Sequence, residues 1–199
     1  MWKRVKKSLA KRKPENYEEK KADLEKLKAE QKAGALQLYY ADGAGVSMET
    51  SVPYAWQKRG ERLEIPCFKG KSLHLFGIWD AKKDLHLYSA EHTLNSQTVI
   101  AFIDNFLKEQ APPLTIVIDN APIHTSKIFI DKQLEWSQKG FKIFHLPTYS
   151  PQLNLIEHLW RFMKYEWIEF SAYDCWDSLV SYVEEIAHNF GTKYTITFV

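Results

Sequence analysis

The sequence has little of what marks exported or membrane-inserted proteins. Its two cysteines, Cys67 and Cys175, lie far apart and outside any CxxC pattern. They therefore predict neither a disulfide framework nor a zinc site, and we expect both to be small core residues of a cytoplasmic protein. No apolar run approaches the roughly 20 residues that cross a bilayer, and no apolar segment follows the basic N-terminus. We expect no membrane partner.

Acidic residues are absent from residues 1–13, which hold seven of the 27 basic residues. The 20 other basic residues face 25 acidic ones, so the rest of the chain carries a charge of −5 although the whole chain carries +2. A basic arm on a mildly acidic body suggests salt-dependent contact with a polyanion, and a solvated tail is the alternative. The residues concerned are Lys3, Arg4, Lys6, Lys7, Lys11, Arg12 and Lys13.

The composition, by contrast, is that of a folded protein. Hydrophobic residues make up 45% of the 199 residues and aromatic residues 14%, which is ample for the core of one domain. Residues 15–34 are rich in Glu, Lys, Leu and Ala but have few apolar positions, so they predict a thinly anchored, mostly solvated helix. We expect residues 1–34 to be a basic arm and helical linker, and residues 35–199 to be the domain.

Apolar patterning in the body predicts an α/β fold with a mixed sheet. Alternating or continuous apolar runs predict strands at residues 36–42, 62–68, 72–79, 85–90, 114–118 and 141–146. Helical spacing predicts helices at residues 95–110 and 126–139, from about Asn154 onward, and at 176–190. The first four strands suggest an antiparallel meander, to which the later strands are added in parallel through crossover helices.

Three acids stand at the ends of these elements. Asp42 leaves the first strand, Asp119 leaves the apolar strand 114–118, and Glu157 lies in the first turn of a helix. If the two strands are neighbours, both aspartates meet at one edge of the sheet, and a packed helix can bring Glu157 there. Gathered carboxylates repel one another unless a cation neutralises them, and oxygen ligands favour Mg²⁺ or Mn²⁺. Two such ions, about 3.5–4 Å apart, suit an in-line phosphodiester displacement.

Each acid also has a structural interpretation. Asp42 with Gly43 is a common turn pair, and Asp119 could begin a loop or cap a helix. Asn154 and Glu157 have the spacing of a capping box. Glu157 also shares a helix face with two basic residues, so a solvated ion pair is a further alternative. Spacing alone does not decide between these interpretations.

Two longer blocks resemble the signature motifs of DDE transposases, in the mariner-like branch that includes bacterial insertion-sequence relatives. The blocks are residues 118–124, IDNAPIH, and residues 149–160, YSPQLNLIEHLW. Residues 40–45, YADGAG, are similar to the family's first-aspartate block. The resemblance covers residues 36–199, and long motifs matching in order make it specific.

The resemblance implies a ribonuclease-H-like fold and a transposase catalytic domain that performs metal-dependent DNA strand cleavage and strand transfer. It implies that Asp42 contacts both of two Mg²⁺ ions, for which Mn²⁺ can substitute, and that Asp119 and Glu157 complete the sites. Water and then a freed 3′-hydroxyl would be the nucleophiles. Asn120 and His124 match motif positions behind the metal ligands or in contact with DNA. The expected partner is DNA, bound by a homodimer at the nucleoid, with no organic cofactor.

The sequence departs from the family at two motif positions. The family usually has an acidic residue where Gly43 stands and proline where Leu155 stands. Nothing in the chain corresponds to the helix-turn-helix region that reads the element ends. One alternative is therefore a catalytically silent, truncated remnant that binds DNA or full-length enzyme. A host nuclease of the same fold is another alternative.

Overall fold

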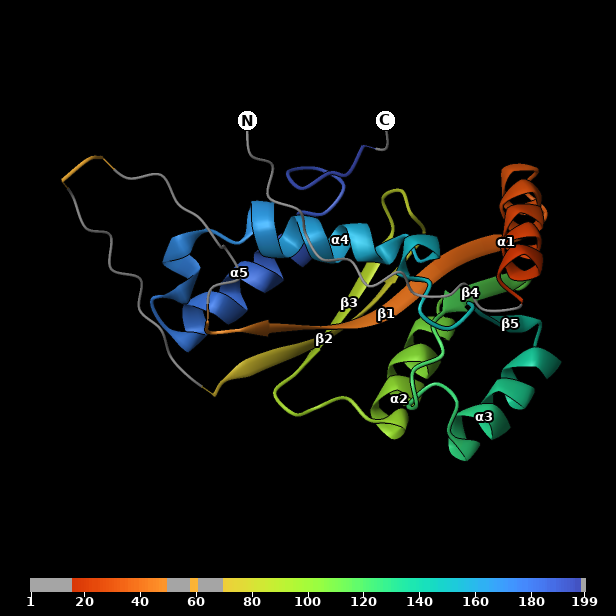
Figure 1. Cartoon of the computed structure of the whole chain (residues 1–199). Helices are drawn as coiled ribbons and strands as arrows, with labels where there is room; N and C mark the ends of the chain where they lie inside the picture. Colours follow the sequence, from red (N-terminus) through yellow and green to blue (C-terminus); the bar gives the residue numbers. More distant parts are fainter. Residues whose placement is uncertain (1–15, 50–57, 61–69, 198–199) are drawn as a thin grey trace.

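A five-stranded sheet forms the centre of the molecule, and helices cover both of its faces (Figure 1). The computed structural model describes residues 16–49, 58–60 and 70–197. The strands follow the order β3-β2-β1-β4-β5 across the sheet. Their bounds are β1 (Gln37–Ser47), β2 (Ser72–Trp79), β3 (Leu85–Ala90), β4 (Leu114–Ile118) and β5 (Phe141–His145).

The sheet is mixed, as the sequence predicts. β1, β2 and β3 form an antiparallel meander, whereas β4 pairs in parallel with both β1 and β5. All five residues of β4 are buried, because helices cover the middle of a parallel arrangement on both faces. β1 is therefore the strand at which the antiparallel and parallel halves of the sheet meet.

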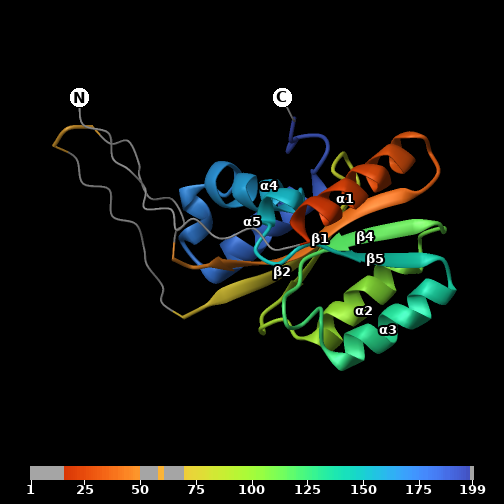
Figure 2. The same cartoon turned by 45° about the vertical axis from the view of Figure 1, so that its right-hand side comes forward.

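The helices divide into two groups, one on each face of the sheet (Figure 2). α2 (Ser96–Leu107) and α3 (Lys127–Gln138) cover one face. α1 (Tyr17–Lys32), α4 (Ile156–Phe162) and α5 (Trp176–His188) cover the other. Short 3-10 helices lie at Pro151–Leu153 and Phe170–Tyr173, and a π-helical turn at Met163–Trp167 continues α4. None of the helices in the described ranges is long and apolar enough to cross a membrane.

Side chains of β1 point alternately to the two faces of the sheet, so the strand contributes residues to both cores. Leu38 and Tyr40 pack into the core beneath α1, α4 and α5, whereas Tyr39 and Ala41 pack into the core beneath α2 and α3. Each large side chain buried in this way contributes about 1.5–3 kcal/mol. A shift of β1 by one residue would exchange the two sets, so burial on both faces fixes the register of this strand.

The structure corrects the predicted end of the first strand. β1 does not turn at Asp42 and Gly43 but continues to Ser47, because residues 40–47 pair with β2 over their whole length. The turn interpretation of Asp42 is therefore wrong, and this acid lies in the middle of a strand. The strand predicted at residues 62–68 lies outside the described residues.

Two smaller expectations have different outcomes. α1 is mostly exposed and is anchored by Tyr17 and Leu24, which are buried in the core beneath α1, α4 and α5. The helix is therefore as thinly anchored as its few apolar positions predict. Cys175 is exposed at the start of α5, so the expected core position is wrong. Cys67 lies outside the described residues.

Candidate active site

The register of the sheet brings Asp42 and Asp119 to the same level. Tyr40 on β1 pairs with Val117 on β4, so two residues further on the parallel strands reach Asp42 and Asp119. β4 ends at Ile118, and Asp119 is the first residue beyond it. Because side chains alternate along a strand, Asp42 shares the face of Tyr40, which is the face that α4 covers, and Asp119 lies beside it at the end of β4.

α4 approaches the sheet closely at the position of Asp42. The residue opposite Asp42 on β2 is Gly77, and a Cβ atom there would lie 2.8 Å from the ring of Trp160 and 2.9 Å from Ile156. Both of these side chains come from α4 and are buried. The missing side chain at Gly77 therefore lets the first turn of α4, which carries Glu157, pack directly over the strand of Asp42.

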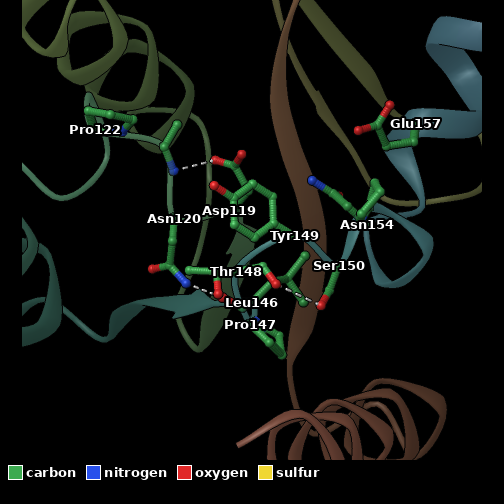
Figure 3. A pocket seen from close by; sticks show the side chains of 12 residues that line it. Asp119, Asn120, Pro122, Leu146, Pro147, Thr148, Tyr149, Ser150, Asn154 and Glu157 are labelled. Carbon is green, nitrogen blue, oxygen red and sulfur yellow. Dashed lines mark hydrogen bonds between the residues drawn. The ribbon is translucent and has the colours of Figure 1, made fainter. Parts of the chain in front are cut away.

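A cavity of about 390 Å³ opens between the acids (Figure 3). Asp119 and Glu157 both line it, from opposite sides of β1. The loop after β5 forms another wall, from which Tyr149 projects with 77% of its surface exposed. Asp42 is not among the residues that line the cavity.

The three acids interact electrostatically. Burial, together with the nearby negative charges of Asp119 and Glu157, raises the pKa of Asp42 from its ordinary value of 3.8 to about 7. A hydrogen bond of 2.7 Å from the Gly43 N–H to Asp42 Oδ1 opposes this rise only in part. Burial and Asp119 also raise the pKa of Glu157, against the opposing charge of Lys164. The site thus concentrates negative charge in a partly desolvated place.

Asp119 is held by neighbours that stabilise its ionised form. Its Oδ1 lies 2.7 Å from Nδ1 of His124 and accepts a hydrogen bond of 3.0 Å from the Ala121 N–H. Burial alone would raise the pKa of Asp119, but these hydrogen bonds outweigh burial and lower it. His124 is only 1% exposed, so its contact is with Asp119 rather than with solvent. Since an ionised carboxylate only accepts, Nδ1 is assigned as the donor.

The other candidates from the motifs have different surroundings. The side-chain amide of Asn120 donates to the backbone carbonyl of Leu146, which ties the end of β4 to the end of β5. Asn154 does not cap α4, because the residue at the cap is Leu155 and no side chain bonds there. The capping-box interpretation is therefore wrong. The seven basic residues of the predicted arm lie outside the described part of the chain.

Sequence reasoning missed three residues around the acids. Gly77 lies in no motif, and its contribution to the site is visible only from the close approach of α4 to it. Tyr149 and Asn154 both lie inside the second motif block, which by itself indicates no role at the cavity for either. Tyr149 has a φ of 54°, a region that non-glycine residues rarely adopt, so the loop beside the cavity is locally strained.

The three acids lie near one another but do not form a complete metal-binding group. Within residues 16–49, 58–60 and 70–197, no three His, Cys, Asp or Glu side chains already lie where one ion could bind them all. Carboxylates that repel one another are expected to stay apart in the absence of a compensating charge.

The family follows from the sequence. The profile of the family described as DDE superfamily endonuclease matches residues 37–180, which is most of the chain. The chain belongs to this family, as its motifs predict. No curated protein matches the sequence.

Solved structures share the fold. The Mos1 strand transfer complex aligns with a TM-score of 0.64 and 18% identity, over 96% of this chain and 61% of the Mos1 chain. The catalytic domain of Mos1 mariner transposase aligns with a TM-score of 0.56 and 18% identity, over 92% and 85% of the two chains. The catalytic core of BIV integrase gives 0.51 and 12%, over 81% and 87%. The chain thus spans about 61% of the Mos1 protein of that complex, and the predicted ribonuclease-H-like fold is confirmed.

Proposed function

We propose that this chain is the catalytic domain of a DNA transposase, which cuts DNA strands and joins them to a target with the help of divalent metal ions. The observation that carries the proposal is the electrostatic coupling of Asp42, Asp119 and Glu157 in a chain of the DDE endonuclease family. Mos1 complexes of the same fold are paired-end and strand transfer complexes, which supports DNA as the partner. Pairing of two copies on DNA is part of the proposal.

The residues fit a divalent cation. Asp42, Asp119 and Glu157 offer only oxygen donors, which Mg²⁺ and Mn²⁺ prefer. Burial and the negative charges of Asp119 and Glu157 raise the pKa of Asp42, and a bound cation would offset both effects by stabilising the carboxylate. When bound, two such ions would polarise the scissile phosphodiester and lower the pKa of attacking water. Mos1 complexes with Mn and with Mg support the choice of metal.

The chain's own residues would orient the reaction. His124 and the Ala121 N–H hold Asp119 ionised and in one orientation, so that it is ready to bind a cation at neutral pH. Water would be the first nucleophile and the freed 3′-hydroxyl the second, each attacking phosphorus in line with the leaving oxygen. Tyr149, exposed at the cavity wall, offers a ring against which a base or sugar can pack.

Cleavage of DNA tests the proposal. Duplex oligonucleotides that carry the DNA sequences flanking the chain's own coding sequence are incubated with the protein and Mg²⁺. Metal-dependent nicking or joining is expected, and Asp119→Ala is expected to abolish it. Asp131→Ala is the matched control, because Asp131 is exposed on α3 on the other face of the sheet. Cleavage that survives Asp119→Ala would contradict the assignment of the site.

A catalytically silent DNA-binding remnant is the second candidate, and it is favoured by Gly43, which stands where the family usually has an acidic residue. It predicts no cleavage with any divalent metal, but DNA affinity that falls steeply with salt. Deletion of residues 1–13 would reduce the slope of log affinity against log salt by about 0.9 for each phosphate that the arm neutralises. Salt-sensitive binding together with metal-dependent cleavage would instead support the transposase.

A further inference from the structure

Asn154 connects the surroundings of two of the acids. It is 3% exposed, and its side-chain amide donates a 3.2 Å hydrogen bond to the carbonyl of Ala41, the residue before Asp42. Its own backbone carbonyl accepts a 3.1 Å hydrogen bond from the N–H of Glu157. One buried residue is thus bonded both to β1 next to Asp42 and to the first turn of α4 at Glu157.

The other side-chain atom of Asn154 lacks a partner among the described residues. Its Oδ1 is buried and accepts no hydrogen bond. Asn154 also lines the cavity, where Figure 3 shows it between Asp119 and Glu157. An unsatisfied buried acceptor is costly, so native structures usually provide it with water, an ion or a ligand. An amide oxygen can accept a hydrogen bond only from a donor, and a water molecule bound to a cation is a strong donor.

We infer that Asn154 is a positioning residue that fixes Asp42 and Glu157 relative to each other and accepts, through Oδ1, a hydrogen bond from a water molecule on the divalent cation. The inference rests on the proposed function and extends it to the residue that assembles the site. A purely structural role would account for the bond to Ala41 but would leave Oδ1 buried without a partner. A helix cap is excluded, because no side chain bonds the start of α4.

Binding of Mn²⁺ to the DNA-free full chain tests the inference without relying on activity. Electron paramagnetic resonance of free Mn²⁺ gives the affinity, and thermal melting in EDTA confirms that each variant folds. Asn154→Leu keeps a similar volume and removes both polar atoms, and we expect it to weaken Mn²⁺ binding about tenfold or more. Should this variant not fold, the smaller Asn154→Ser takes its place with the same expectation.

Two further variants separate the possible outcomes. Gln152→Ala is the matched control, since Gln152 lies two residues away and bonds Tyr17 rather than the acids, and it should bind Mn²⁺ unchanged. Asp119→Ala should lose Mn²⁺ binding. A folded Asn154 variant that binds Mn²⁺ as tightly as the unaltered chain, while Asp119→Ala does not, would overturn the inference alone. Mn²⁺ binding by the unaltered chain that is absent or independent of Asp119 would overturn the proposed function.

Discussion

The two halves of the candidate site are built in different ways. Asp42 and Asp119 come from adjacent parallel strands, and the hydrogen-bonded register sets them level with each other. Glu157 comes from the seven-residue helix α4, which reaches the site by packing on Gly77 and through the hydrogen bonds of Asn154. The sheet half therefore depends on backbone pairing and the helix half on side-chain packing.

The two halves should therefore respond differently to mutation. A strand register shifts only in steps of whole residues and at the cost of both cores, so the level of the two aspartates is robust. A packed helix can move by fractions of an ångström when one side chain changes. Changes at the helix half should therefore alter the distance of Glu157 from the aspartates without unfolding the sheet.

The largest effect on the sheet half is expected from Asp42→Asn. The folded pKa of Asp42 is about 7 and its ordinary value is 3.8, so the folded, metal-free protein loses stability as pH rises from 3.8 through 7. Asparagine cannot ionise, so the variant should be more stable in EDTA at pH 8, by at most about 4 kcal/mol. The gain should be small at pH 4.5, and cleavage should be abolished. Thermal melting at the two pH values measures this, and an equal shift at both would contradict it.

Gly77→Ala disturbs the packing of α4, and so the position of Glu157. The added Cβ would lie within 3 Å of Trp160 and Ile156, so α4 must shift and we expect a loss of about 1–3 kcal/mol. Cleavage should fall because Glu157 moves with α4. Gly45→Ala on β1 is the control, since nothing lies within 4 Å of its added Cβ. Chemical denaturation compares the two variants, and an equal loss of stability in both would show that close packing at Gly77 is not the cause.

His124→Phe tests whether the hydrogen bond from His124 keeps Asp119 ionised in the sheet half. It fills the buried space but removes the hydrogen bond to Asp119, so we expect the pKa of Asp119 to rise and cleavage to fall about 10–100-fold. The control is His86→Phe, which removes a similar interaction, 3.1 Å from Asp84 Oδ1, at a residue that packs against Phe106 of α2 and does not line the cavity. Cleavage rates at saturating DNA measure the effect. Equal losses of cleavage rate in the two variants would contradict the proposed role of His124.

The sequence predicted the sheet half better than the helix half. The apolar run 114–118 and the alternation before Asp42 specify adjacent strands, because burial on both faces leaves few other arrangements. The end of β1 was missed, since Asp42 and Gly43 resemble a turn locally and only pairing with β2 extends the strand. The role of Gly77 was also missed, because close approach of a helix is a tertiary property that no local pattern encodes.

The same contrast holds for the polar residues. The hydrogen bond between His124 and Asp119 spans five residues and lies within one motif block. The bond from Asn154 to Ala41 joins residues 113 positions apart, so the capping-box spacing to Glu157 was the stronger local signal and proved misleading. Residues that assemble a site from distant segments are the ones that sequence patterns describe least well.

Anomalous X-ray diffraction from crystals grown with Mn²⁺ shows whether the three acids bind metal. We expect manganese peaks in the cavity, with carboxylate oxygens of Asp42, Asp119 and Glu157 as ligands. Manganese bound only elsewhere on the protein, with these three carboxylates uncoordinated, would contradict it.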